Sequence, residues 1–134
     1  MQIVFYSAAP GETTDKLKKL VAPLVPKEKM EIAHGLGNLS RILRRPRVEQ
    51  TVAILLATTY QELVDLKDLS ELLSFVRLIV VAPDEKKETV DMAYQLHPRF
   101  LSFCDSDFSD VAGVVGKMIN SRSGWELGLG EKTI

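Results

Sequence analysis

The feature that most constrains the fold is a short apolar run in the middle of the chain, residues 50–60 (QTVAILLATTY). Its apolar residues, 52–56, do not alternate with polar ones, and polar residues bound the run on both sides. Such a run is typical of a strand buried on both faces, as in a parallel sheet covered by helices. The residues that follow such a strand lie at the carboxyl edge, where open α/β folds place their functional groups. Here Ala57, Thr58 and Thr59 offer no acid, no base and no nucleophile stronger than a hydroxyl.

Four further strands are predicted from short apolar runs, at residues 2–6, 30–33, 77–82 and 100–104. Apolar residues at helical spacing predict helices between them and after the last, within residues 13–25, 38–45, 59–76, 85–96 and 107–120. Strand and helix therefore alternate five times, and right-handed crossovers then give a single-domain, doubly wound α/β sheet with helices on both faces. We expect one domain over residues 1–120 and a loosely ordered, Gly-rich tail at 121–134, since no internal repeat or linker is visible.

Several residues predict where the helices begin and end. Pro26 is expected to stop the first helix, whose apolar face would include Leu17, Leu20, Val21 and Leu24. Asn38 is expected to cap the second. Capping-box spacing recurs at Thr59 with Glu62 and at Asp68 with Glu71. Three acids just beyond strand ends are interpreted as helix caps: Asp84, Asp105 and Asp107. For the last helix, Ser106 is an alternative cap to Asp107.

Composition excludes several classes of function. Seventeen basic and eighteen acidic residues nearly cancel, so bulk charge indicates no nucleic-acid or acidic-membrane partner. Cys104 is the only cysteine, which excludes a disulfide framework and a cysteine zinc site. No apolar run reaches membrane-spanning length and no signal peptide is apparent, so a cytoplasmic location is expected. His34 and His97 are far apart in sequence and are interpreted as exposed loop residues, with no metal site expected.

The order of elements, and stretches such as VAILLAT (52–58) and RLIVVAPDEKKETVDMAYQL (77–96), resemble the receiver domain of bacterial two-component response regulators. By element order and spacing the resemblance covers roughly nine-tenths of the chain. It implies a flavodoxin-like, CheY-like sheet with strand order 2-1-3-4-5. The matching patterns are patterns of apolar spacing, so they concern the fold and carry no chemistry.

The chemistry of a receiver must be checked at its signature positions. Receivers carry an acidic pair after the first strand that holds magnesium; here it falls on Tyr6 and Ser7, or on Ser7 and Ala8. The phosphoacceptor aspartate closes the third strand, and Ala57 stands there. An acyl phosphate needs a carboxylate nucleophile, so its absence alone prevents aspartyl phosphorylation.

The remaining two signature positions are also changed. A receiver ends its fourth strand with Ser or Thr and its fifth with Lys, whereas this chain has Ala82 in the first place and Phe103 and Cys104 in the second. The resemblance therefore implies a pseudo-receiver: a phosphorylation-independent signalling and protein-interaction domain, not an enzyme, with no cofactor.

Receivers bind partners or a second copy through the face formed by their fourth helix, fifth strand and fifth helix. On this chain the resemblance implies a partner or homodimer face that includes Tyr94, Arg99 and Lys117, which Trp125 of the tail would extend. Exposed aromatic residues are frequent interface anchors, although a tryptophan is as often packed within its own domain.

An alternative comes from the loop after the first strand. Ser7, Gly11, Thr13 and Thr14 resemble, with one residue extra, the loop by which flavodoxins hold the FMN phosphate. Such loops cradle phosphate at a helix N-terminus, and Tyr60 could stack on a flavin. These residue types are also ordinary capping residues, so a capped strand-to-helix turn explains the same pattern.

Overall fold

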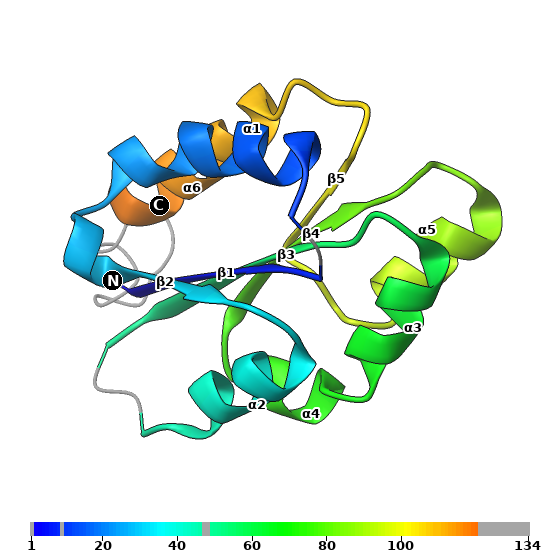
Figure 1. Cartoon of the computed structure of the whole chain (residues 1–134), viewed down its shortest axis with the longest axis horizontal. Helices are drawn as coiled ribbons and strands as arrows, with labels where there is room; N and C mark the ends of the chain where they lie inside the picture. The colour runs from blue at the N-terminus through cyan, green and yellow to red at the C-terminus, as the bar shows by residue number, and fades with distance from the viewer. Residues whose placement is uncertain (1, 9, 47–48, 121–134) are drawn as a thin grey trace, which may run out of the picture.

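The chain folds into one five-stranded parallel sheet covered by helices on both faces (Figure 1). The structure, a computed structural model, describes residues 2–8, 10–46 and 49–120. The strands are β1 (Gln2–Ser7), β2 (Met30–Ala33), β3 (Thr51–Leu56), β4 (Arg77–Ala82) and β5 (Phe100–Phe103). Their order is β2-β1-β3-β4-β5, which confirms the predicted doubly wound, flavodoxin-like fold class. The predicted tail, residues 121–134, lies outside the described residues.

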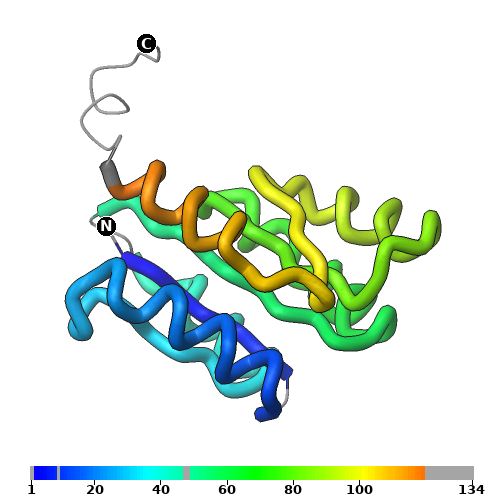
Figure 2. The backbone as a smooth tube through the Cα atoms, turned by 90° about the horizontal axis from the view of Figure 1, so that it is seen from above, coloured from blue at the N-terminus to red at the C-terminus, as the bar shows by residue number. Residues whose placement is uncertain are grey.

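The helices divide between the two faces of the sheet, as Figures 1 and 2 show. One face is covered by α1 (Glu12–Val21) and α6 (Ser109–Asn120). The other is covered by α2 (Leu36–Arg44), α3 (Tyr60–Lys67), α4 (Ser70–Leu73) and α5 (Lys87–Tyr94). Two short 3₁₀ turns, η1 (Ala22–Leu24) and η2 (Lys27–Lys29), lead from α1 into β2. None of these described helices combines the length and apolarity that crossing a membrane requires.

The central strand β3 is buried at all six residues, as the unalternating run predicts. Side chains of a strand point alternately to its two faces. Val52, Ile54 and Leu56 therefore pack under α1 and α6, whereas Ala53 and Leu55 pack under α2 to α5. Fully burying a large aliphatic side chain stabilises a fold by about 1.5–3 kcal/mol. The middle of the sheet thus joins both cores.

The register brings the ends of the strands to a common edge. Ser7 lies opposite Leu56, and Ala82 lies opposite Phe103. The ladders continue one residue beyond the strands, since the Ala57 amide donates to the Val81 carbonyl at 2.9 Å. The carboxyl ends of β1, β3, β4 and β5 therefore lie side by side. These are the strand ends that the sequence analysis compared with the signature positions of receivers.

The first two helices differ from prediction at their ends. α1 stops at Val21 because Pro23 has no amide hydrogen to continue the ladder, so the chain tightens into η1. Leu20, inside α1, and Leu24, in η1, are 38% and 37% exposed rather than on the buried face. The prediction that Asn38 caps the second helix is also wrong: α2 begins at Leu36, after Gly35.

Local geometry explains the beginning of α2. Gly35 has φ 107°, a conformation that glycine adopts without steric cost. Asn38 lies inside the helix, and its side-chain oxygen reaches back to accept the His34 amide at 3.0 Å. Asn38 thus satisfies a backbone donor at the helix start from within the first turn.

Of the two predicted capping boxes, the one at Thr59 forms its hydroxyl bond, while its Glu62 side chain bonds the amide of Thr58 rather than that of Thr59. The Thr59 hydroxyl accepts the Glu62 amide at 3.2 Å and caps α3. Asp68 instead ends α3, and α4 follows Leu69 without a side-chain cap. The Asp68 prediction was wrong because the chain stays helical through this residue, which has φ −63° and ψ −19°, whereas a cap residue has extended backbone angles.

Candidate functional site

The carboxyl edge of the sheet is the candidate site, because it gathers the positions where a receiver carries its chemistry. Its first position is the end of β1. Tyr6 is 2% exposed and belongs to the core beneath α2 to α5. Burial raises the pKa of its hydroxyl, and the carboxylates of Glu62 and Asp65 raise it further. Ser7 is half-buried and Ala8 is exposed, so this strand end offers no carboxylate pair to a divalent cation.

The centre of the edge is closed by packing. Ala57 and Ala82 are both 0% exposed. The Cys104 thiol donates a hydrogen bond to the Ala57 carbonyl at 3.4 Å, within sulfur's longer hydrogen-bonding range, and the Cys104 amide donates to the Ala82 carbonyl at 2.9 Å. Phe103 is half-buried against the core beneath α2 to α5. In the place of a phosphoacceptor and its lysine, the chain therefore has two methyl groups, a ring and a thiol.

The thiol at this edge is an unreactive one. Burial raises the pKa of Cys104 to about 11, and the nearby carboxylates of Glu62, Asp105 and Asp84 add to the shift. A thiol with such a pKa is almost wholly protonated at neutral pH, and the thiolate is the nucleophile. Cys104 therefore serves this edge as a small packing residue.

Carboxylates do lie near the edge, but they bind helix starts. Glu62 accepts the Thr58 amide at 2.8 Å and the Thr58 hydroxyl at 3.1 Å. Asp84 accepts the Lys86 amide at 3.0 Å, and Asp107 accepts the Ser109 amide at 2.9 Å. The bond of Asp107 to the first amide of α6 agrees with its predicted role as a cap. The prediction for Asp84 was wrong, because Asp84 bonds the amide of Lys86 in the turn before α5, and α5 has no side-chain cap.

Hydrogen bonds also lower the pKa of two of these acids. A hydrogen bond from Thr89 is the main cause that lowers the pKa of Asp84. For Asp107 the main cause is the hydrogen bond from the Ser109 amide. Asp105, the third predicted cap, forms no such bond to a helix start among the described residues.

One polar pair at this edge escaped the sequence analysis. Ser102 is only 2% exposed, in the middle of β5, and its hydroxyl donates to the Asp110 carboxylate at 2.9 Å. Asp110 lies in the first turn of α6, so this bond fixes the start of α6 on β5. The available signal was a serine within an otherwise apolar strand, since a buried hydroxyl needs a partner.

The loop from β1 to α1 does not form one cradle. The hydroxyls of Ser7 and Thr14 lie 2.8 Å apart and share a hydrogen bond. Both line a hollow of about 250 Å³ that also includes His34. Thr13 lines a different hollow, of about 340 Å³, together with Cys104. Ser7 and Thr14 of the predicted phosphate loop therefore line one hollow and Thr13 lines another, so these residues do not converge on a single site.

The charge at the start of α1 also opposes an anion. Gly11 precedes the helix without a side-chain cap. Glu12 and Asp15 occupy the first turn, and these carboxylates already balance the positive end of the helix dipole. A phosphate there would meet two like charges.

The predicted interaction residues lie around the edge of the sheet formed by β5. Tyr94 ends α5 and is 56% exposed. Arg99 and Lys117 are also exposed. α5 and α6 lie on opposite faces of the sheet (Figure 1), so Tyr94 and Lys117 belong to helices on its two sides. Trp125, the fourth predicted residue, lies outside the described residues.

Phe75 is an exposed aromatic residue that the sequence analysis missed. It is 68% exposed, in the turn between α4 and β4. The sequence presents it within a run of helical spacing, Leu69 to Val76, so nothing in the pattern distinguished it from the buried residues around it.

The two histidines lie at opposite edges of the sheet. His34 follows β2 at the carboxyl edge, whereas His97 precedes β5 at the amino edge, and both are exposed. Within the described ranges, no group of three or more His, Cys, Asp or Glu side chains has an arrangement suited to a metal ion.

Compared with known proteins, the chain matches no family model and no curated protein. Its function must therefore be argued from the residues of the fold themselves.

Proposed function

We propose that this protein is a phosphorylation-independent, receiver-like signalling domain that acts in the cytoplasm by binding protein and has no enzymatic activity. The observation that supports the proposal best is the state of Ala57. It ends the central strand, is fully buried, and has its carbonyl oxygen bonded to the Cys104 thiol. The fold is intact around a position that can accept no phosphoryl group.

The chemistry that such an edge lacks is specific. A phosphoryl group transferred to protein needs a nucleophile, and the receiver reaction uses a carboxylate. Magnesium neutralises the phosphoryl oxygens only where carboxylate oxygens hold it. Tyr6, Ser7 and Ala57 supply neither group. What remains for function is the surface of the fold.

The surface that we assign to partner binding is the β5 flank, defined by Tyr94, Arg99 and Lys117. All three residues are exposed, and aromatic residues and arginine are enriched in protein interfaces. The partner is a protein, and a second copy bound through the same flank is the homodimer that the receiver resemblance implies.

A phosphorylation assay tests the first half of the proposal. The purified protein is incubated with acetyl phosphate and Mg²⁺ and its intact mass is recorded, with an active receiver domain treated in parallel. We expect a phosphoryl adduct on the receiver and none on this protein. An adduct that hydroxylamine removes, as it removes acyl phosphates, would overturn the proposal.

A second measurement tests the flank. Sedimentation equilibrium is compared between the unchanged protein and the Tyr94→Ala and Arg99→Glu variants, both altered at exposed positions. If the β5 flank forms a homodimer, both variants weaken it. A dimer that neither variant changes does not use this flank.

The FMN alternative has weaker support from the geometry. Ser7 and Thr14 bond each other, Thr13 faces a separate hollow, and Glu12 adds negative charge to the helix start. We expect colourless protein whose melting temperature is unchanged by saturating FMN. A bound flavin would raise that temperature by mass action and would make the alternative the better account.

A further inference from the structure

A groove runs along the outer edge of β2, on the side of the sheet opposite the β5 flank. It has a volume of about 790 Å³ and lies between β2 and the segment that joins α1 to β2. Its apolar lining includes Val25, Met30 and Ile32, all half-buried. Met30 and Ile32 are alternate residues of β2, so they point to the same face of the sheet. We call this feature the β2 groove.

The rim of the β2 groove is basic. Lys18, Lys19 and Lys27 line it, and Asp15 is the one acid among its described lining residues. The local excess of positive charge contrasts with the near-neutral composition of the whole chain. An occupant with apolar side chains and carboxylates would complement both the lining and the rim.

The backbone of β2 offers a second means of recognition. In the described sheet β2 is an end strand that pairs with β1 alone. The outer side of an end strand can pair with an added extended segment, whose alternate side chains then enter pockets beside the edge. The groove thus suits an extended segment with apolar residues at every second position.

The chain itself contains such a segment. Residues 121–134 (SRSGWELGLGEKTI) lie outside the described residues, and their sequence places Trp125, Leu127 and Leu129 at every second position. The acids of this segment are Glu126 and Glu131, and its two bases, Arg122 and Lys132, lie on either side of the stretch 123–131 that contains both acids. Alternation of this kind predicts a strand with one apolar face, and the two carboxylates match the lysines of the rim.

The connectivity favours a segment from another molecule. α6 returns to the amino edge of the sheet and contacts η1, the turn through which α1 leads to β2 (Figure 1). To reach the outer edge of β2, the same chain would have to cross this connection on the same edge of the sheet. Connections in natural folds avoid such crossings. A second copy meets no such obstacle.

We propose that the β2 groove binds residues 121–134 of a second copy of this chain as an added strand, with Trp125, Leu127 and Leu129 on the apolar lining. Two copies can exchange these segments reciprocally, which closes a two-fold dimer. This surface is separate from the β5 flank, so the proposal does not depend on the proposed function.

The fluorescence of Trp125 provides the test, because it is the only tryptophan of the chain. Its emission is recorded on the full chain across a concentration series that spans the monomer–dimer transition measured by sedimentation. We expect a blue shift that develops together with dimer formation. A blue shift at all concentrations in a monomer would indicate docking within one chain and would overturn the proposal. Emission typical of water at every concentration would overturn it equally.

A charge reversal tests whether the β2 groove is the place of docking. Lys19→Glu with Lys27→Glu changes two exposed rim residues, and we expect a dimer about tenfold weaker. Adding Glu126→Lys and Glu131→Lys should restore most of the lost affinity. Lys67→Glu with Lys86→Glu, exposed on the other face of the sheet, is the matched control and should leave the dimer unchanged. Equal weakening by both pairs, or no rescue, would reject the β2 groove.

Discussion

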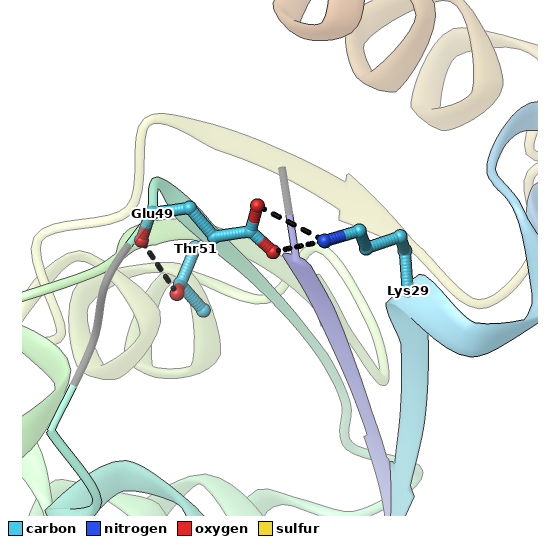
Figure 3. A network of polar contacts seen from close by, with 3 residues as sticks. All are labelled: Lys29, Glu49 and Thr51. Atoms are coloured by element: carbon cyan, nitrogen blue, oxygen red, sulfur yellow. Dashed lines mark hydrogen bonds and ion pairs between the residues drawn. The ribbon is translucent and has the colours of Figure 1, made fainter.

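The two edges of the sheet are built from opposite kinds of residue. At the carboxyl edge, Ala57 and Ala82 are fully buried and a thiol closes the space beside them. At the amino edge, charged residues bind one another: Lys29 donates to both oxygens of Glu49, at 2.9 and 3.2 Å (Figure 3). Open α/β folds usually concentrate polar groups at the carboxyl edge. Here the strand ends Ala57 and Ala82 at the carboxyl edge are apolar, and the ion pair between Lys29 and Glu49 lies at the amino edge.

The polar groups of the amino edge connect segments that are distant in sequence. Lys29 directly precedes β2, and Glu49 comes shortly before β3. The Thr51 hydroxyl donates to the Glu49 carbonyl at 3.5 Å, which holds this residue beside the start of β3 (Figure 3). Arg45, after α2, pairs with Glu31 of β2. These contacts join the connections before β2 and before β3, and the side chains that form them are partly exposed to water.

Arg77 adds a further cation to the amino edge. Its guanidinium donates to the Gln50 side chain at 3.3 Å. Burial, with a smaller contribution from the neighbouring charge of Arg99, lowers the pKa of Arg77 to about 10. The group remains charged at neutral pH. The strand ends at the carboxyl edge are therefore part of the hydrophobic core. The amino edge contributes ion pairs that are partly exposed to solvent and therefore weaker.

The largest effect is expected from returning a carboxylate to the carboxyl edge. Ala57→Asp should lower the free energy of unfolding by about 3 kcal/mol or more at pH 7, because the new charge would be buried without a partner. Burial raises the pKa of such a carboxyl above its unfolded value. The loss should therefore be smallest at low pH, where both states are protonated, and should grow as the pH rises above about 4. Urea unfolding at several pH values measures it.

The matched control is Ala8→Asp, which places the same residue at an exposed position of the same edge. We expect it to change stability by less than about 0.5 kcal/mol. If Ala57→Asp were as well tolerated and became phosphorylated by acetyl phosphate, the edge would be an open site and the contrast with the amino edge would be lost.

Much of the fold could be predicted from local patterns, because a strand buried on both faces is an apolar run without alternating polar residues. The apolar run of residues 52–56 predicts the central strand, and the alternation of elements predicts a doubly wound sheet; the order of its strands was predicted only from the resemblance to receivers. The contact between Cys104 and Ala57 joins residues 47 positions apart. This contact depends on how the ends of β3 and β5 pack in the folded sheet, so it could not be predicted from the sequence around either residue.

The candidate site was predicted only in part, for the same reason. Substitution of each signature position is readable in the sequence, as at Ala57. Whether Ser7, Thr13 and Thr14 converge depends on how α1 lies over the sheet, and the structure divides them between two hollows. Asn38 is not the cap because Gly35 adopts a positive φ and α2 begins directly after it, which places Asn38 inside the helix.

The reactivity of Cys104 should show the next largest effect. Its pKa of about 11 predicts that alkylation at pH 8 is about a hundredfold slower than for an unperturbed thiol. The rate should rise as the pH approaches 11. Because the folded pKa is raised, the stabilisation by the neutral thiol is full below pH 9, the ordinary value for this group, and is lost as the pH rises towards 11.

Iodoacetamide labelling followed by mass spectrometry measures this rate, with protein unfolded in urea as the control for an accessible thiol. Rapid labelling of the folded protein at pH 8 would mean that the carboxyl edge is open to solvent. Cys104 would then be a candidate nucleophile rather than a packing residue.

A helix cap at the carboxyl edge should have an intermediate effect. Thr59→Ala removes the acceptor of the Glu62 amide at the start of α3, and we expect a loss of about 1 kcal/mol in the free energy of unfolding. Thr13→Ala is the control, since α1 has no side-chain cap, and it should cost less than about 0.5 kcal/mol. Equal losses in the two variants would show that capping does not explain the effect at Thr59.

The smallest effect is expected at the amino edge. Lys29→Ala removes one partner of Glu49, and the two side chains are 40% and 31% exposed. Exposed ion pairs contribute about 0.2–1 kcal/mol, so the loss of stability should stay within that range. Adding 1 M salt should reduce the difference from the unchanged protein, because the screening length falls to about 3 Å.

Lowering the pH should also reduce the difference in stability between Lys29→Ala and the unchanged protein. The hydrogen bond from Lys29 is the main cause that lowers the pKa of Glu49 below its ordinary value of 4.5. A carboxyl with a lowered pKa stabilises the fold above its unfolded pKa and loses that contribution as the pH falls through the folded value. The gap between Lys29→Ala and the unchanged protein should therefore close below pH 4.5. Lys87→Ala, which removes an ion pair 89% and 59% exposed, is the control and should cost less still. A loss above about 2 kcal/mol at Lys29 would place it beyond exposed ion pairs and would make the amino edge as structural as the carboxyl edge.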